Sequence, residues 1–218
     1  MTAVVSVDRD GGAVARAALE RSVHGGGVAI FPSDGVYGLA CDPLREDAIE
    51  RIHALKGRSG RTPSAVLFFS PLAMREVVSS LGPRTRDALG ALLPGPVTLV
   101  VANPERRFPN ACRDDPERLG LRLIGGPLAG AGCAVFQTSA NRSGEPPAAD
   151  FAAVDPGLVD GVDLAIDGGA LGGMPSTVVD LTGLESGDGW SLLREGALAA
   201  AEVDRRLAAV GTSPDGRP

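Results

Sequence analysis

Residues 45–69 of the chain read REDAIERIHALKGRSGRTPSAVLFF, and this stretch decides the class of fold. Apolar residues recur at the spacing of one helix face from Ala48 to Leu55, which predicts a helix over residues 45–55. The continuous apolar run at residues 65–69 predicts a buried strand. A short basic loop joins the two. A helix, a cationic loop and a buried strand in succession predict an α/β fold.

The rest of the chain repeats this alternation of strand and helix patterns. Strands are predicted at residues 28–31, 97–102, 119–124, 134–138, 162–166, 176–181 and 191–194, and helices at 13–23, 72–81, 84–93 and 201–210. Ser70 followed by Pro71 is typical of a helix start, because serine caps free amide groups and proline fits the first turn. Residues 103–117 are predicted as a surface loop and residues 211–218 as a disordered tail. We therefore expect one domain over residues 1–210.

The composition argues against several classes of protein. A net charge of −6 and a pI near 5.0 disfavour a protein that coats nucleic acid by its overall charge. The cysteines, Cys41, Cys112 and Cys133, are odd in number and lack CxxC spacing, so neither a disulfide framework nor a zinc site is indicated. No apolar run is long enough to cross a membrane, and no targeting segment is evident. We expect a cytoplasmic protein with reduced thiols.

Lys56 stands out because it is the only lysine among 21 basic residues. Where every other basic residue is an arginine, a lysine indicates a position for a compact ammonium with three donors, such as a tight phosphate site. Arg58 and Arg61 share its short loop with glycine and proline residues, and this clustering favours anion binding. An exposed lysine without a function is the alternative.

Three other segments carry polar groups that a ligand could use. The turn at residues 32–39 presents a hydroxyl, a carboxylate and a phenol, but an ordinary turn next to a buried tyrosine would look the same. The turn at residues 138–147 could line a nucleotide pocket or bond only to its own backbone. Arg194 could clamp a phosphate or form an exposed ion pair with Glu195. Spacing alone does not choose between these readings.

Taken together, the segments follow the order of the motifs of one enzyme family. They are SDGVYGL at residues 33–39, KGR at 56–58, PGPVTL at 94–99, Arg122, SANRSG at 139–144, STVVD at 176–180 and LREG at 193–196. Over about residues 13–200 the chain resembles the YrdC-type threonylcarbamoyl-adenylate synthase family. The resemblance implies a twisted, open, mixed α/β sheet flanked by helices, with a large cationic concave cavity.

The resemblance also implies an activity. Such enzymes form threonylcarbamoyl-adenylate and pyrophosphate from L-threonine, bicarbonate and ATP, and pass the product to a separate transferase complex that modifies an adenosine of transfer RNA. The reaction forces a carbamate against a triphosphate, so it needs fixed positive charge where negative charge accumulates. The chain has no obvious carboxylate cage, so Mg²⁺ is expected to arrive on the ATP phosphates.

Site residues follow from the same resemblance. Lys56 and Arg58 fall on the catalytic positions. The ATP-binding positions are Lys56, Arg58, Thr62, Ser139, Asn141, Pro147 and Arg194, and the threonine-binding positions are Ser33, Gly35, Arg122 and Ser176.

Two departures from the family pattern keep other functions open. Gly35 stands where the family carries a second hydroxyl that helps to hold threonine. The segment at residues 125–137 is shorter than the corresponding segment of the family, so the helix expected there is missing or truncated. One alternative is therefore a paralogue that adenylates or carbamoylates a different substrate with the same ATP cradle. Another is a non-catalytic module that grips double-stranded RNA, or weak RNA binding beside catalysis.

Overall fold

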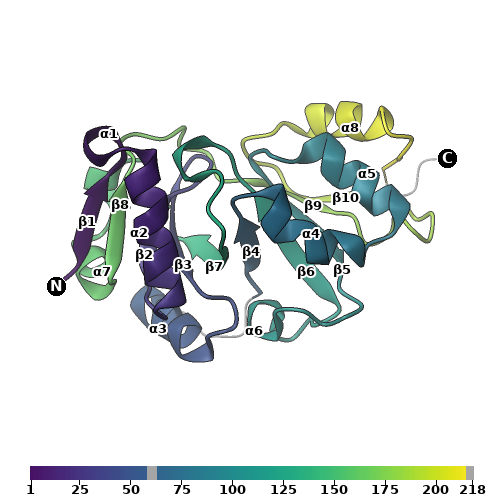
Figure 1. Ribbon diagram of the computed structural model, residues 1–218. Helices are drawn as coiled ribbons and strands as arrows, with labels where there is room; N and C mark the ends of the chain where they lie inside the picture. Colours follow the sequence, from purple (N-terminus) through teal and green to yellow (C-terminus); the bar gives the residue numbers. More distant parts are fainter. Residues whose placement is uncertain (58–62, 215–218) are drawn as a thin grey trace.

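The computed structural model describes residues 1–57 and 63–214 of the 218-residue chain (Figure 1). Its described strands form one mixed sheet of ten, in the order β1-β8-β2-β3-β7-β4-β6-β5-β9-β10. The strands are β1 (Ala3–Ser6), β2 (Ala29–Pro32), β3 (Tyr37–Cys41), β4 (Ala65–Phe68), β5 (Val97–Ala102), β6 (Arg118–Leu123), β7 (Ala134–Ser139), β8 (Leu164–Asp167), β9 (Thr177–Asp180) and β10 (Ser191–Arg194). The predicted class, an α/β fold around a large mixed sheet, is confirmed.

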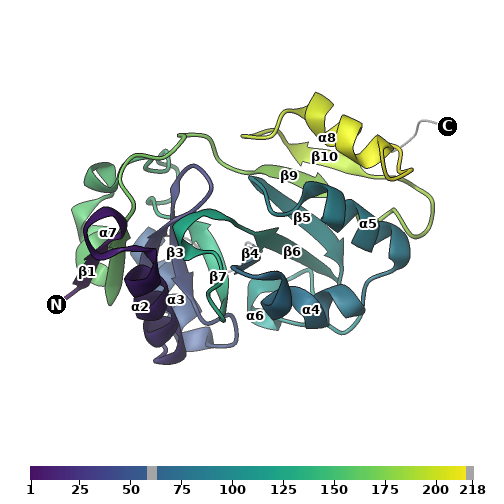
Figure 2. The same ribbon diagram turned by 45° about the horizontal axis from the view of Figure 1, so that its top comes forward.

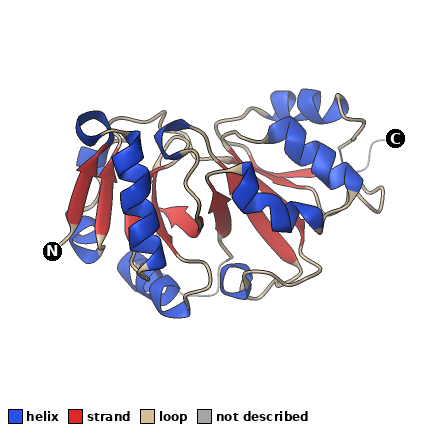
Figure 3. Ribbon diagram, viewed as in Figure 1, coloured by secondary structure: helices blue, strands red, loops and turns tan. Residues whose placement is uncertain are grey.

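Helices flank this sheet, as Figure 3 shows. They are α1 (Val7–Asp10), α2 (Gly12–His24), α3 (Glu46–Lys56), α4 (Pro71–Ser79), α5 (Pro83–Leu92), α6 (Pro109–Cys112), α7 (Pro156–Gly161) and α8 (Ala200–Ala208), with short 3₁₀ turns η1 (Gly126–Leu128) and η2 (Phe151–Ala153). Within residues 1–57 and 63–214, none of the helices combines the length and apolar character needed to span a bilayer.

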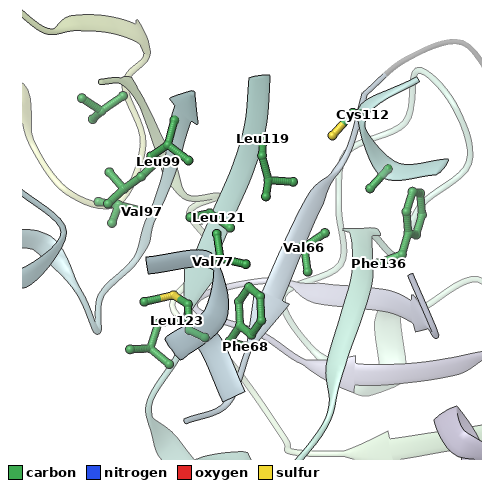
Figure 4. Close-up of a cluster of buried hydrophobic side chains, with 14 of the residues drawn as sticks. Val66, Phe68, Val77, Val97, Leu99, Cys112, Leu119, Leu121, Leu123 and Phe136 are labelled. Atoms are coloured by element: carbon green, nitrogen blue, oxygen red, sulfur yellow. The ribbon is translucent and has the colours of Figure 1, made fainter. Parts of the chain in front are cut away.

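Two hydrophobic clusters lie on the two faces of the sheet. In the first, apolar side chains of α3, α4, α5 and α8 pack against one face, which includes Val66, Leu99 and Leu121 (Figure 4). In the second, α2 packs against the opposite face around Phe31 and Leu67. Alternate residues of a strand point to opposite faces, so the helices on each side determine which side chains of the strands are buried.

On the second face, α2 covers only part of the sheet, and the strands at the other end have no described helix over them on this side. Helix α2 contacts η1 and the strands β1, β2, β3 and β8, whereas β5, β6 and β9 have their helices on the first face (Figure 2). On β5 the residues from Val97 to Val101 alternate between buried and partly exposed. The partly exposed set therefore forms the floor of a concavity.

The predicted helices and strands are present, with ends that shift by at most two residues. Ser70 caps α4 by accepting a hydrogen bond from Ala73 N at 3.2 Å, and Pro71 occupies the first turn. Between residues 125 and 137 only the 3₁₀ turn η1 precedes β7, so the helix expected there is truncated, as predicted.

Two regions are more ordered than the sequence indicates. Residues 103–117 contain α6 and are organised by the buried Asn103, whose amide nitrogen donates to Arg107 O and Pro116 O, both at 2.9 Å. Residues 211–214 are not a disordered tail, because Thr212 is buried and Pro214 bridges to Trp190. Residues 215–218 lie outside the described residues.

Candidate functional site

A cavity of about 590 Å³ lies over the open face of the sheet. Its floor comes from alternate positions of adjacent strands, and its walls come from the turns around residues 34, 141 and 175. The polar side chains that line it are Asp34, Ser64, Thr98, Asp115, Arg118, Arg122, Gln137, Thr138, Ser139, Asn141, Glu145, Ser176 and Arg194. Gly120 keeps the floor low, since a Cβ there would stand 3.3 Å from Ala65 Cα.

Lys56 is buried directly behind one wall of this cavity. It is 3% exposed, and its ammonium donates to Ser139 O at 2.5 Å, Asn141 O at 2.7 Å and Asn141 Oδ1 at 3.3 Å. Its backbone carbonyl accepts from Ser143 N at 2.8 Å. Gly57 ends α3 in the left-handed conformation, with φ of 62°. The end of α3 is thus bonded to the turn at residues 139–143 through both main chain and side chain.

The turn itself is held by its own side chains. Ser139 Oγ donates to Asn141 Oδ1 at 2.5 Å, and Asn141 Nδ2 donates to Arg142 O at 2.8 Å and Glu145 O at 2.6 Å. Both readings of this turn therefore hold in part: it bonds to its own backbone, and it also lines the cavity.

Arg122 lies on the floor, between two partners. One terminal nitrogen, Nη1, donates to Gln137 Oε1 at 2.8 Å, and the other, Nη2, donates to Asp34 Oδ2 at 2.7 Å. Burial raises the pKa of the Asp34 carboxyl, and the Arg122 guanidinium opposes that rise. Burial also lowers the pKa of Arg122. The charge of Asp34 opposes this decrease, and the nearby charge of Arg194 adds to it. An arginine keeps its proton in proteins, so Arg122 stays cationic, and its Nη2 lies 2.7 Å from Asp34 Oδ2.

Arg194 reaches the same cavity from the edge strand. A bulge in β10 between Leu192 and Arg194 brings Arg194 opposite Val178, another cavity residue. Its Nη2 donates to Ser176 O at 2.7 Å. Glu195 caps α8 instead, accepting from Ala200 N at 2.8 Å, and no carboxylate among residues 1–57 and 63–214 pairs with Arg194. The exposed Arg194–Glu195 ion pair is therefore absent.

Two hydroxyl groups and one further arginine, Arg118, complete the floor. Thr98 Oγ1 and Ser176 Oγ share a hydrogen bond of 2.9 Å. Arg118 lies four residues before Arg122 on β6, so both side chains point to the same face of the sheet. Arg118 pairs with Asp180, and its Nη1 lies 3.6 Å from Asp115 Oδ2. In the described lining the three arginines face three carboxylates, Asp34, Asp115 and Glu145. A net positive cavity stays a prediction, since Arg58 and Arg61 lie outside the described residues.

A family profile matches residues 21–196, most of the chain, and its family carries the description "Telomere recombination". The chain belongs to the Sua5/YciO/YrdC family. The motifs at residues 33–39, 56–58, 139–144 and 193–196 all fall inside the matched region or at its end. The predicted family membership is confirmed.

Two relatives from different organisms carry the same name. The threonylcarbamoyl-AMP synthase of Nitrosococcus oceani is 40% identical over 134 residues, which cover 59% of this chain and 71% of that protein. The threonylcarbamoyl-AMP synthase of Xanthomonas euvesicatoria is 35% identical over 150 residues, covering 66% and 80%.

Solved structures of the family share the fold. P. abyssi Sua5 complexed with L-threonine has a TM-score of 0.79 and 25% identity, and covers 98% of this chain. The chain spans only 62% of that longer protein. E. coli YciO has a TM-score of 0.77 and 23% identity, and the match covers 93% of this chain and 98% of that one, which supports the fold alone.

Most described residues that the family pattern implicates do meet at the cavity. Its lining includes Ser139, Asn141, Pro147, Arg122, Ser176 and Arg194. The predicted positions Arg58 and Thr62 lie outside the described residues. Ser33 and Gly35 are not part of the lining: Ser33 Oγ is buried, and no described residue bonds to it.

Gly35 is enclosed by another segment of the chain. Gly173 N donates to Gly35 O at 2.8 Å, and a Cβ at position 35 would collide with the carbonyl oxygen of Met174. The φ of Gly35 is 150°, which side chains rarely adopt. The missing hydroxyl therefore does not leave free space, because the backbone at Met174 fills it.

Sequence reasoning did not place Gln137, Asp34 or Arg118 in the site. The sequence shows Asp34 as a carboxylate in a turn, but its partner Arg122 is distant in sequence and only the strand order brings them together. Tyr37 is buried, as the alternative of an ordinary turn next to a buried tyrosine predicts. Its OH donates to Gly169 O at 2.7 Å and accepts from Gly168 N at 2.9 Å.

Proposed function

We propose that this protein is a threonylcarbamoyl-AMP synthase, which forms threonylcarbamoyl-adenylate and pyrophosphate from L-threonine, bicarbonate and ATP. The observation that carries the proposal is the buried ammonium of Lys56, bonded to a turn that lines a cavity shared with Arg122 and Arg194. Membership of the family and the name of its relatives support it.

The nucleotide half of the cavity suits an adenylation. Ser139, Asn141, Pro147 and Arg194 are proposed to hold ATP, with Lys56, Arg58 and Thr62 completing the ATP site. Lys56 fixes the turn so that its groups do not have to reorganise as charge moves on the phosphates, which is the main way a protein assists such a transfer. Arg58 is proposed to act on the reacting groups, and Lys56 to support catalysis through the turn that it holds in place.

The amino-acid half lies on the sheet floor. Ser176 and Arg122 are proposed to receive threonine, together with the turn that contains Ser33 and Gly35. The amine combines with bicarbonate to give a carbamate and water. One carbamate oxygen then attacks the α-phosphorus of ATP, and the bond to pyrophosphate breaks. Holding both anions in line supplies much of the rate enhancement that the protein can offer.

Magnesium is proposed to enter with the nucleotide. Among residues 1–57 and 63–214, no three His, Cys, Asp or Glu side chains gather in a way that could hold a metal ion. Mg²⁺ binds phosphate oxygens and keeps several waters, so it can neutralise the triphosphate without a cage of protein ligands.

The product defines the expected partner. A carbamoyl-adenylate is a reactive mixed anhydride, so a transferase complex acting on transfer RNA is the proposed receiver, in the cytoplasm. Weak RNA binding by the synthase would assist this transfer.

The direct test measures pyrophosphate release. We expect turnover of ATP to AMP and pyrophosphate only when threonine and bicarbonate are both present. Release that ignores threonine would contradict the proposal.

A paralogue acting on a different amine is the second candidate, and the contact between Gly35 and Met174 favours it. The backbone at Met174, two residues before Ser176, occupies the space that a side chain at position 35 would need. In the same assay, turnover supported by another amino acid but not by threonine would select this candidate. A double-stranded RNA-binding module is a weaker alternative, because the chain has a net charge of −6 and only 4% aromatic residues. It predicts salt-sensitive RNA binding and no pyrophosphate release.

A further inference from the structure

Asp34 is a carboxylate in the cavity that the proposed reaction does not yet use. Its Oδ2 accepts from Arg122, and its side chain is 17% exposed. No described residue donates to its other oxygen, Oδ1. One half of the carboxylate is therefore fixed by an ion pair, while the other half is available to a ligand.

The pair changes what the cavity can attract. Asp34 neutralises Arg122, so a simple carboxylate approaching Arg122 meets a repelling charge 2.7 Å from the guanidinium. A molecule that carries both an ammonium and a carboxylate meets an opposite charge at each end. A guanidinium has five N–H donors, and among the described residues only two of those on Arg122 have partners. Arg122 can therefore still donate to a ligand while Asp34 remains bound.

We propose that Asp34 receives the α-ammonium group of the amino-acid substrate on Oδ1 and takes a proton from it, while Arg122 donates to the α-carboxylate. This inference rests on the proposed function. The proton moves from nitrogen to Asp34 and the N–H bond breaks. The freed amine reacts with bicarbonate to give the carbamate and water, and Asp34 returns the proton to solvent.

A purely structural role for Asp34 makes a different prediction. If Asp34 only balances the charge of Arg122, its removal changes the binding of every carboxylate ligand by the same factor. If it binds the ammonium, its removal acts on ligands that have an amine and spares those that lack one. A thermodynamic cycle separates these cases, in which a ligand with the amine and a ligand without it are each measured on the wild type and on the Asp34 variant.

The experiment compares threonine with 2,3-dihydroxybutanoate, in which a hydroxyl replaces the amine. Dissociation constants are measured by calorimetry on the full chain, for the wild type and for Asp34→Asn. We expect the wild type to bind threonine at least about tenfold more tightly, as for a hydrogen bond to a charged group. Asp34→Asn should reduce the difference to less than about threefold. ATP binding by the variant confirms that it is folded.

Asp115→Asn is the matched control, because it removes another carboxylate from the same cavity, one that lies beside Arg118. It should keep the preference for the amine. Equal changes for both ligands in Asp34→Asn, or loss of the preference in Asp115→Asn as well, would overturn the inference. A wild type that binds neither ligand nor any other amino acid overturns it too. A wild type that prefers the amine but never releases pyrophosphate leaves the ammonium site standing and removes the proposed synthase activity.

Discussion

Lys56 shows how one residue can connect two segments of a site. Its ammonium has three acceptors on the turn at residues 139–141, and the side chain is buried. Three acceptors arranged around one nitrogen suit the three donors of an ammonium, whereas a guanidinium spreads its donors over a planar fork. The geometry explains why a lysine occurs in a chain that otherwise uses arginine.

Replacing Lys56 with arginine tests this requirement. We expect Lys56→Arg to lower turnover in the pyrophosphate assay at least about tenfold, because the larger group displaces the turn that lines the cavity. Arg45→Lys is the control, since Arg45 pairs with Asp47 on the surface. Near-normal turnover of Lys56→Arg would show that the ammonium is not needed.

Tyr37 offers a direct measurement, because it is the only tyrosine. Burial raises the pKa of its phenol from 10.0 to about 12. Between these values the folded chain keeps a proton that the unfolded chain releases, so the free energy of unfolding should fall as the pH rises through this window. Ultraviolet absorbance of tyrosinate follows the titration, and urea unfolding follows the stability.

Tyr37→Phe should remove that part of the pH dependence. It should also cost about 1–3 kcal/mol near neutral pH, because Gly168 N and Gly169 O lose their partner. A phenol that titrates near pH 10 in the folded protein would contradict the buried hydrogen bonds.

At the scale of elements, local patterns predicted most of the fold. Helices α2, α3, α4, α5 and α8 and most strands follow from periodicity and from signals such as Ser70-Pro71. The sequence does not separate strand β3 from the preceding turn, because all five residues of the strand are buried and show no alternation. The sequence predicts only a loop for residues 103–117, since one buried amide, rather than a repeated pattern, holds them together.

Asn103 can be tested as the organiser of that segment. We expect Asn103→Ala to lower the free energy of unfolding by about 1–3 kcal/mol, because two carbonyls and Arg107 N lose the buried amide. Chemical denaturation provides the measurement, and Asn110→Ala, in the same segment, is the control. Equal stability of Asn103→Ala and the wild type would mean that the segment holds its shape without Asn103.

At the scale of the whole molecule, the site depends on the strand order, which no local pattern encodes. The partners Asp34 and Arg122 come from a turn and a strand far apart in the chain, and Arg194 comes from the edge strand at the opposite end of the sheet from β1 (Figure 1). The family motifs identified several cavity residues in advance, but they could not show which charges pair. Binding across such a site should stabilise the folded chain as one unit.

Thermal unfolding with ATP, threonine and both together measures that linkage. A ligand at one hundred times its dissociation constant adds about 2.7 kcal/mol of stability, which for a chain of this size raises Tm by roughly 5–10 °C. We expect such a shift with ATP and a larger one with both ligands, since each ligand that binds the folded chain adds to its stability. A shift with ATP that threonine does not increase would point to an altered amino-acid pocket beside Met174. No shift with ATP at all would contradict a nucleotide site in the cavity.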